Sequence, residues 1–392
     1  MNEILIKLTT SLMRPKWIKY CSQTLYESLS FCNNMYIITS DNCWKNEALT
    51  IIKKIRMTQK EDGGFDIGYE FNFGKIHKKG WSSAPECKMF VSLIDFGSLF
   101  GFDYVNDIIV KGINWIINNS IKLEDNKWII PYCPDATKEL IVYNGISFAL
   151  APLANYYNSI EENKEIKTIH DGYINYLYDE FEWEKGYWKY FDQNRENLTD
   201  IQIKKVDNYH LAQQLEMHCY SYKNLENSKN RALIDKLSNY LLQLYEEKYP
   251  EPMPYLNYLS NEEYGVHLWG YASLINGFLS YYDISNDKRY LDKSREIFEW
   301  IGGNTRINNH FMCIFRYDNN INKRFYPRSD AWVINNLSNY LKYDLNESLL
   351  IPIQETYHKI KKQDFSGFEN HASTRMSKII NYAHNKYLKR FK

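Results

Sequence analysis

The sequence has little of several features that mark particular classes of protein. Lys and Arg together number 48, and so do Asp and Glu, so the formal net charge is zero. This balance argues against a protein that coats nucleic acid or lies on anionic lipid, because both functions need a basic excess. No apolar run reaches the roughly 18 residues of a membrane span, so we expect no membrane insertion.

Cysteine gives no sign of a metal centre or a disulfide framework. The seven cysteines are odd in number and scattered, and no two of them form a CxxC pair. The first residues, MNEILIKLTTSLMRPKWIKY, include an early Glu3 and no long apolar stretch, unlike a secretory signal. We therefore expect reduced thiols in a cytoplasmic protein, with no metal and no cofactor.

Aromatic residues, in contrast, are abundant. They make up 16% of the chain, with 34 Tyr, 19 Phe and 10 Trp, and hydrophobic residues reach 44%. Such a composition supports a large buried core and excludes a disordered chain. Tyr and Trp combine apolar area with a polar group, which favours either a wide cleft lined by aromatic rings or a core rich in tyrosine.

Apolar residues recur at helical spacing along most of the chain. The segments with this spacing, which we predict to be helices, are 15–33, 44–59, 83–100, 104–120, 138–157, 164–179, 206–223, 229–247, 264–282, 287–301, 328–342, 345–361 and 374–390. Pro152 falls inside one of them and should kink or split that helix.

A short aromatic, turn-rich segment follows every second predicted helix, about once in sixty residues. The aromatic residues that anchor these segments are Phe65, Trp128, Trp188, Tyr255, Phe311 and Phe365. Six helical hairpins cannot each bury their apolar faces alone, so neighbours must stack. We predict an all-α fold, an (α/α)6 toroid in which residues 1–392 form a single domain. The first helix of each pair should lie inside, with short aromatic β-like hairpins on one face; an open solenoid is the alternative.

The segment Gln59–Phe65 (QKEDGGF) resembles the QxxDGGF/W segment of the six-hairpin α/α-toroid superfamily. The nearest resemblance is to polysaccharide-biosynthesis proteins of the VpsJ type and to the helical domain of glucuronyl epimerases. Terpene cyclases of this shape need a DxDD motif, which the chain lacks. Prenyltransferase subunits and lanthionine cyclases need a zinc set of Cys and His, and the pair His218-Cys219 has no second matching pair. The resemblance therefore implies a glycan-related role, with an oligo- or polysaccharide as partner.

In a closed ring, the N-termini of the inner helices converge on one mouth, and residues near them should line a common pocket. The catalytic candidates there are His210, His267, Tyr209, Tyr264, Glu86 and Asp330. The substrate-binding candidates are Trp81, Asn144, Asp207, Arg328, Trp332 and Asp62.

Each candidate also has a structural interpretation. Asp207 and Asp330 could cap helices, and Glu86 could interact with a helix dipole. Asp62 stands before Gly63-Gly64, where Asp commonly stabilises a turn. A lone buried histidine is most often a hydrogen-bonded core residue.

Three functions fit such a pocket. Removal of the proton beside a uronate carboxylate, as in a lyase or epimerase, needs a His or Tyr base, an acid, and Arg or Asn to hold the developing charge. His210, Tyr209, His267, Tyr264, Arg328 and Asn144 could supply this set, and the His- and Tyr-rich mouth favours it. Inverting glycoside hydrolysis needs two carboxyl groups, for which Glu86, Asp207, Glu263 and Asp330 are candidates. The third function is a scaffold that binds glycan or protein without catalysis. The sequence alone leaves the glycan and the oligomeric state open.

Overall fold

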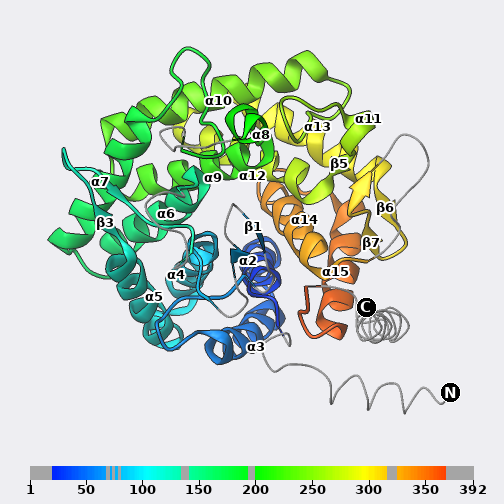
Figure 1. Cartoon of the computed structure of the whole chain (residues 1–392). Helices are drawn as coiled ribbons and strands as arrows, with labels where there is room; N and C mark the ends of the chain where they lie inside the picture. Colours follow the sequence, from blue (N-terminus) through cyan, green and yellow to red (C-terminus); the bar gives the residue numbers. More distant parts are fainter. Residues whose placement is uncertain are drawn as a thin grey trace, which may run out of the picture.

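The computed structural model describes residues 20–67, 71–72, 76–77, 81–133, 141–192, 199–315 and 325–367. In this part of the chain, helices form two concentric rings (Figure 1). The inner ring contains α2 (Ser22–Thr39), α4 (Lys88–Phe100), α6 (Tyr143–Ser159), α9 (Asn208–Asn224), α12 (Leu268–Ser285) and α14 (Pro327–Tyr340). The outer ring contains α3 (Asn42–Thr58), α5 (Asn106–Asn119), α7 (Lys164–Asp179), α10 (Ser228–Lys248), α13 (Lys288–Asn304) and α15 (Glu347–Lys362).

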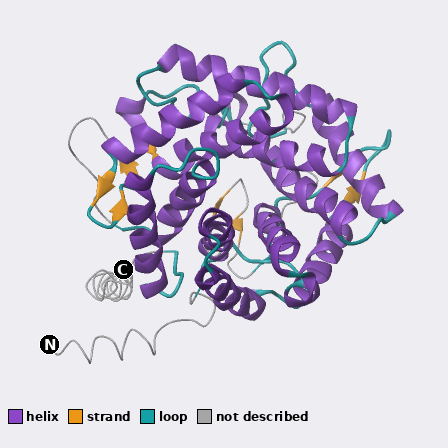
Figure 2. Ribbon diagram, turned by 180° about the vertical axis from the view of Figure 1, so that it is seen from behind, coloured by secondary structure: helices purple, strands orange, loops and turns teal. Residues whose placement is uncertain are grey.

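The inner ring is closed. Each inner helix packs on the next, from α2 through α4, α6, α9 and α12 to α14, and α14 packs on α2. The opposite view shows the same arrangement, with α2 and α14 as neighbours (Figure 2). The predicted all-α toroid is therefore confirmed over the open solenoid, and the first helix of each pair lies inside, as predicted.

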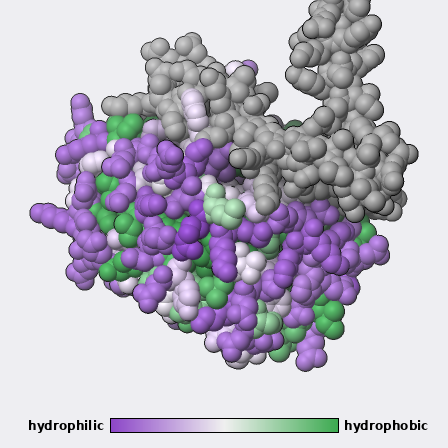
Figure 3. Space-filling view, turned by 90° about the horizontal axis from the view of Figure 1, so that it is seen from below, coloured by the Kyte–Doolittle hydropathy of each residue, from purple (hydrophilic) through white to green (hydrophobic). Residues whose placement is uncertain are grey.

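The two rings differ in the pattern of their buried residues. The outer helix α3 buries Trp44, Ala48, Ile51, Ile52 and Ile55, which form one stripe at helical spacing. The inner helix α12, in contrast, is buried on nearly all sides. The outer helices therefore turn polar faces to solvent. Figure 3 shows one side of the molecule, on which hydrophilic residues predominate and apolar residues form separate patches.

Tyrosine forms a large part of the core. Among the largest fully buried side chains are Tyr26, Tyr143, Tyr173, Tyr209, Tyr245, Tyr271, Tyr290, Tyr340 and Tyr357. Several of their hydroxyls bond to polar groups at the edge of the core: Tyr143 donates to Glu180 and Tyr357 donates to Glu47. Much of the aromatic excess is thus explained by packing between the two rings.

Short strands link the outer helices to the next inner helices. The pairs are β1 (Phe71–Asn72) with β2 (Ile76–His77), β3 (Ile121–Lys122) with β4 (Trp128–Ile129), and β6 (Arg306–Ile307) with β7 (His310–Phe311). A fourth pair joins β5 (Val266–His267) to β8 (Ile314–Phe315). Because each of these hairpins precedes an inner helix, they share the face where the inner helices begin. The remaining short elements are η2 (Ala84–Cys87), η3 (Phe102–Tyr104), α8 (Asp200–Lys204) and α11 (Asn261–Tyr264).

Pro152 does not split its helix, which is one of the two effects predicted for it. The helix α6 runs without a break through Pro152. Proline removes one hydrogen bond and costs about 3 kcal/mol in a helix interior. However, α6 is held by α4, α7 and α9, and Pro152 itself is fully buried. Packing therefore keeps the helix intact. The predicted helix 374–390 and the start of the helix predicted at 15–33 lie outside the described residues.

The QKEDGGF segment forms a tight turn after α3. The Gln59 side chain donates to the carbonyls of Gly63 and Ile108, both at 2.8 Å. Gly63 has φ +96°, and a Cβ placed there would come 2.2 Å from the carbonyl oxygen of Lys111. The motif thus holds the turn after α3 against α5. Gly63 is required there because its φ is positive and because a Cβ would have no room.

All seven cysteines are free thiols. Among the described residues, no helix combines the length and apolar character needed to cross a membrane. Nor does this part of the chain place three or more His, Cys, Asp or Glu side chains where they could hold a metal ion.

Substitution of Gly63 by Ala should destabilise the fold by at least about 2 kcal/mol, because it adds a backbone clash to an unfavourable φ. Urea unfolding would measure this loss. Two matched variants separate the causes. Gly101→Ala has φ +102° but no heavy atom within 4 Å of the new Cβ, so it should suffer backbone strain alone, about 1–3 kcal/mol, and lose less stability than Gly63→Ala. Gly303→Ala lies in α13 with open space around it and should be neutral or stabilising. Equal losses in all three variants would contradict the packing described here.

Candidate functional site

The inner helices begin around a cavity of about 210 Å³, which we call the mouth cavity. Its lining comes from the six inner helices and from the segments that lead into them. The lining residues are Gln23, Tyr26, Ile67, Pro85, Glu86, Tyr132, Asn144, Phe148, Tyr190, His210, Gln213, Tyr255, Trp269, Arg328 and Trp332. Five of the predicted site residues are therefore brought together: Glu86, Asn144, His210, Arg328 and Trp332.

His210 is held by the residue that caps its helix. Asp207 is the N-cap of α9, and its Oδ1 accepts a hydrogen bond from the backbone N–H of His210 at 3.1 Å. Its Oδ2 lies 2.6 Å from His210 Nδ1. Asp207 is almost fully buried, whereas the His210 side chain is 19% exposed. The predicted capping role of Asp207 is therefore confirmed, and the same carboxylate also lies against the imidazole of His210.

The Asp207 carboxylate remains ionised in this position. Burial by itself would raise its pKa, but the charge and hydrogen bonds of His210 and the nearby Lys205 ammonium outweigh burial and lower the pKa below its usual value. A buried anion beside Nδ1 favours the tautomer that carries a proton on that nitrogen. The other ring nitrogen, Nε2, is then the one that can accept a proton.

Glu86 lies in η2, directly before α4, and is 1% exposed. Burial raises the pKa of its carboxyl to about 8. A hydrogen bond from Ser22 and the charge of Arg328 oppose this rise, but they do not cancel it. Near neutral pH the Glu86 carboxyl is thus mostly protonated, so that it can donate a proton.

Several polar atoms around the mouth cavity are buried and have no hydrogen-bond partner. These atoms are Gln23 Oε1, Glu86 Oε2, both Asn144 amide atoms, His210 Nδ1, Gln213 Oε1 and Trp332 Nε1, although His210 Nδ1 is close to the Asp207 carboxylate. Buried polar groups in native proteins are nearly always satisfied by protein, water or ligand. Because these atoms belong to residues that line one cavity, the cavity is the candidate site for a polar ligand.

Aromatic rings form one wall of the cavity. Trp269 and Trp332 stack with centroids 4.7 Å apart and an interplanar angle of 29°. His210 has edge contacts with Tyr190 at 5.6 Å and with Trp269 at 5.8 Å. The wall thus offers flat apolar faces next to the titratable groups.

Gln23, Gln213, Tyr190 and Trp269 were not among the sequence candidates. Gln213 lies three residues after His210 on α9 and therefore faces the same side of the helix. A search along the helices at this spacing would have found it. Tyr190 belongs to the segment after α7. It does not stand near the start of an inner helix, so the repeat does not predict that it lines the cavity.

Three predicted catalytic residues, Tyr209, Asp330 and His267, do not line the mouth cavity, and the side chain of a fourth, Tyr264, is not described. Tyr209 is fully buried, and its hydroxyl donates to the carbonyl of Met253 at 3.0 Å. Asp330 is buried, with its Oδ1 accepting from the backbone N–H of Phe311 at 2.8 Å. His267 lies in β5, behind Tyr255 and Trp269, which are 5.3 Å and 6.2 Å from its ring. Tyr264 ends α11, and its side chain, like that of Glu263, lies outside what the structure describes.

Asp62 and Trp81 do not line the mouth cavity. They border a separate, open hollow of about 590 Å³ beside the end of α3. Asp62 Oδ1 accepts from the Gly64 N–H and from the Ser82 hydroxyl, both at 2.9 Å. This is the turn-stabilising role that the sequence left open for Asp62.

Known structures share the fold. A scan against protein-family models finds no match, and a search of curated protein sequences finds none. Among solved structures, the chain is similar to a sugar epimerase from a ruminal bacterium, with a TM-score of 0.61, 11% identity, and 84% of this chain and 90% of that chain covered. Cellobiose 2-epimerase from Bacillus thermoamylovorans gives a TM-score of 0.60 with 12% identity, covering 82% of this chain and 89% of that one.

An unsaturated glucuronyl hydrolase specific for heparin also matches, with a TM-score of 0.60 and 11% identity over 83% of this chain and 87% of that chain. At such low identity these likenesses establish the α/α-toroid fold alone. They do not point to VpsJ-type proteins or glucuronyl epimerases in particular.

Substitution of Glu86 by Gln should weaken the pH dependence of stability. The folded-state pKa of about 8 exceeds the ordinary value of 4.5, so the folded protein retains a proton that the unfolded chain releases. Stability contributed by this group is therefore lost as the pH rises from about 4.5 to about 8. At about pH 8, Glu86→Gln should be more stable than the wild type by about 1–3 kcal/mol.

Urea unfolding at about pH 5 and about pH 8 measures this difference. The control is Glu226→Gln, a change of an exposed side chain between α9 and α10, which should leave the pH dependence unchanged. An identical pH dependence in Glu86→Gln and the wild type would show that Glu86 is ionised in the folded protein.

Proposed function

We propose that this protein is a carbohydrate-active enzyme that transfers a proton at the sugar carbon next to a carboxylate or carbonyl group, as epimerases and lyases do. The observation that carries the proposal is the pairing of His210 with the buried Asp207 in a cavity that also holds the protonated Glu86. These groups supply a base and an acid in one site.

His210 acts as the base. Asp207 holds its Nδ1, so that Nε2 removes the proton from the substrate, and the Asp207 carboxylate stabilises the imidazolium that forms. Asp207 does not itself contact the substrate, because it is not among the residues that line the cavity. It is a positioning residue.

Glu86 acts as the acid. Its raised pKa keeps a proton available near neutral pH, and delivery of this proton to the substrate completes an epimerisation or assists a leaving group. Arg328 lines the same cavity and stabilises the negative charge that develops on the carboxylate or carbonyl oxygen. The Asn144 amide and Trp332 Nε1 supply further donors.

The size and lining of the cavity favour a sugar as substrate. Its volume of about 210 Å³ equals the space of about seven water molecules, which suits a single sugar ring. The stacked Trp269 and Trp332 offer an apolar face to the C–H groups of such a ring. The resemblance of the QKEDGGF segment to VpsJ-type proteins and glucuronyl epimerases supports a uronate in polysaccharide biosynthesis, and two of the structural neighbours are sugar epimerases.

The other two functions receive less support. Inverting hydrolysis needs a second carboxyl group in the cavity, and among the described lining residues Glu86 is the only acid. A closed scaffold would have its mouth residues paired with one another. Here the amide of Asn144 and Nε1 of Trp332 are buried without partners.

Proton transfer can be detected in heavy water. The protein is incubated with glucuronate, with uronate oligosaccharides and with neutral aldoses, and NMR follows deuterium uptake at the carbon beside the carboxylate or carbonyl. Deuterium uptake, or ultraviolet absorbance from a new carbon–carbon double bond, is expected. New reducing ends without either signal would overturn the proposal in favour of hydrolysis, and binding without any reaction would overturn it in favour of a scaffold.

Substitution of His210 by Asn should lower the exchange rate by about 10²–10⁴-fold while leaving substrate affinity nearly unchanged, because the base is lost but the cavity is kept. Asp207→Asn preserves a capping oxygen but loses the carboxylate charge that His210 and Lys205 stabilise, so it should cost about 1–2 kcal/mol of stability while its rate falls. The control is Tyr209→Phe, which removes the hydrogen bond to Met253. It should cost about 1 kcal/mol of stability and leave the rate intact. A large loss of rate in Tyr209→Phe would restore that tyrosine as a catalytic residue.

A further inference from the structure

The ring contains a second cavity, of about 270 Å³, at the end where the inner helices finish. We call it the opposite cavity. It is lined by Ser30, Asn33, Asn34, Ile37, Lys88, Val91, Ser92, Asp95, Ser98, Leu99, Glu216, Tyr220, Asn276, Asn335, Asn339 and Lys342. On α2, α9, α12 and α14 these residues lie one or more turns after those that line the mouth cavity, so the two cavities lie along one axis.

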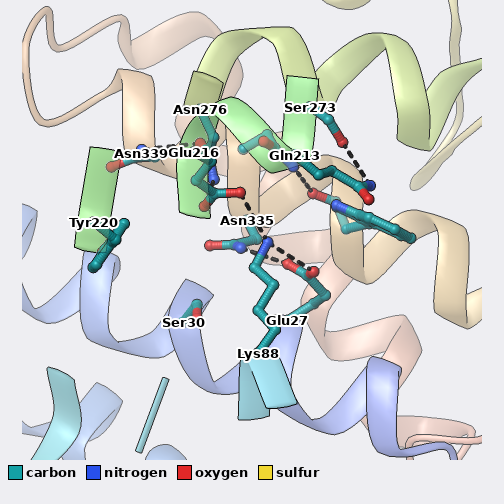
Figure 4. Close-up of polar contacts among 12 residues, drawn as sticks. Glu27, Ser30, Lys88, Gln213, Glu216, Tyr220, Ser273, Asn276, Asn335 and Asn339 are labelled. Atoms are coloured by element: carbon teal, nitrogen blue, oxygen red, sulfur yellow. Dashed lines mark hydrogen bonds and ion pairs between the residues drawn. The ribbon is translucent and has the colours of Figure 1, made fainter. Parts of the chain in front are cut away.

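A wall of buried polar side chains separates the two cavities. Lys88 Nζ lies 3.3 Å from Glu27 Oε1 and 3.2 Å from Glu216 Oε2, and all three side chains are almost fully buried. Figure 4 shows Lys88 directed toward the two carboxylates, which approach it from different helices. Lys88 Nζ also lies 5.9 Å from the ring centre of Trp332, a residue of the mouth cavity.

Amide groups extend this wall toward the opposite cavity. Asn276 donates to Glu216 at 3.0 Å, and Asn339 donates to Asn276 at 2.9 Å. Asn335 donates to Glu27 and accepts from Asn34 at 3.2 Å. These amides are therefore held in fixed orientations by partners inside the protein. Such preorganised donors and acceptors are what a specific polar site requires.

One buried acceptor in this lining has no partner. Asn33 is 4% exposed, and its Nδ2 donates to the carbonyl of Ser92 at 3.2 Å. Its Oδ1 is buried without a hydrogen bond. An orphaned acceptor on the wall of a cavity calls for a donor from a bound molecule, such as a hydroxyl group.

The charges on the lining balance. The cavity has two lysines, Lys88 and Lys342, and two acids, Asp95 and Glu216. The Tyr220 hydroxyl donates to Asp95 at 3.2 Å, and Lys88 is paired with Glu216. Because neither sign is in excess, the site favours a ligand without net charge, in contrast to the mouth cavity with its Arg328.

The rim of the opposite cavity is partly apolar. Ile37 is 49% exposed and Leu99 is 38% exposed, and they lie in the lining with the exposed Ser98 and Lys342. A polar floor with a partly apolar rim matches a molecule that carries several hydroxyls on a compact ring with C–H faces. The volume equals that of about nine water molecules, which again suits one ring.

From these observations we infer that the opposite cavity is a second binding site, and that its ligand is a neutral polyhydroxylated ring such as a monosaccharide or a cyclic polyol. This site is independent of the proton-transfer chemistry at the mouth cavity. Its ligand is bound through Asn33, the amides of the wall and the partly apolar rim.

Methyl α-glucoside is a suitable probe, because it is neutral and has neither a free carbonyl nor a carboxylate that could react. Saturation-transfer NMR and calorimetric titration measure its binding to the full chain. Ser98→Trp places a bulky ring at the exposed rim and should weaken binding by at least about tenfold. Asn33→Ala leaves the rim open and should weaken it by about five- to tenfold, because the orphaned acceptor is lost.

The matched controls are Ser98→Ala, which leaves the rim open, and Asn144→Leu, which alters only the mouth cavity. Both should bind the probe as the wild type does. Three results would overturn the inference: no binding at concentrations up to about 100 mM, loss of binding in Asn144→Leu with retention in Ser98→Trp, or stronger binding of glucuronate than of methyl α-glucoside at the opposite cavity. Failure of the heavy-water exchange with intact probe binding would disprove the proposed reaction alone.

Discussion

The closure of the inner ring between α14 and α2 is the constraint on which both cavities depend. The two helices are separated by about three hundred residues in sequence, and polar side chains join them: Asn34 donates to Asn335 and Ser338, and Asn335 donates to Glu27. All of these side chains are nearly or fully buried. An unpaired amide in such a place would cost roughly 1–3 kcal/mol, so the contacts favour one alignment of the two helices over any shifted one. This alignment places Arg328 and Trp332 opposite Gln23 and Tyr26 at one end of the ring.

The buried ion cluster inside the ring has a related effect. Burial raises the pKa of Glu27 to about 7, although the charge of Lys88 opposes the rise. Burial also acts against the charge on Lys88, but the two carboxylates outweigh it and raise the pKa of Lys88. The carboxyl groups of Glu27 and Glu216 thus share the Lys88 ammonium. Glu27 is partly protonated near neutral pH. Clusters of this kind add little stability over apolar packing, but removal of one member leaves a buried charge uncompensated. The main consequence of the cluster of Lys88, Glu27 and Glu216 is that it stands between the mouth cavity and the opposite cavity.

Most of the fold could be predicted from the sequence, whereas only part of the site could. Helical spacing of apolar residues located the paired helices, and α7 begins and ends where expected, at 164 and 179. The repeat also placed the residues near the helix N-termini at one mouth, which brought Glu86, Asn144, His210, Arg328 and Trp332 together. Repeat position does not determine which way a side chain turns at the start of a helix. Tyr209 and His210 are adjacent, yet Tyr209 turns to the carbonyl of Met253 while His210 lines the cavity. The contacts of Lys88 with Glu27 and Glu216 join three separate repeats, and no local pattern marks such a group.

The seam between α2 and α14 also bears on how the chain is made. Ribosomal synthesis releases α2 long before α14, so Asn34 lacks its partners Asn335 and Ser338 until about three hundred further residues have emerged, whereas Glu27 can already pair with Lys88 on α4. Hairpins such as α2 with α3 can form locally during this interval, but neither cavity exists until the last inner helix docks. A ribosome that stalls before α14 is complete would therefore hold a nascent chain whose ring is open at α2, with the Asn34 amide exposed to water.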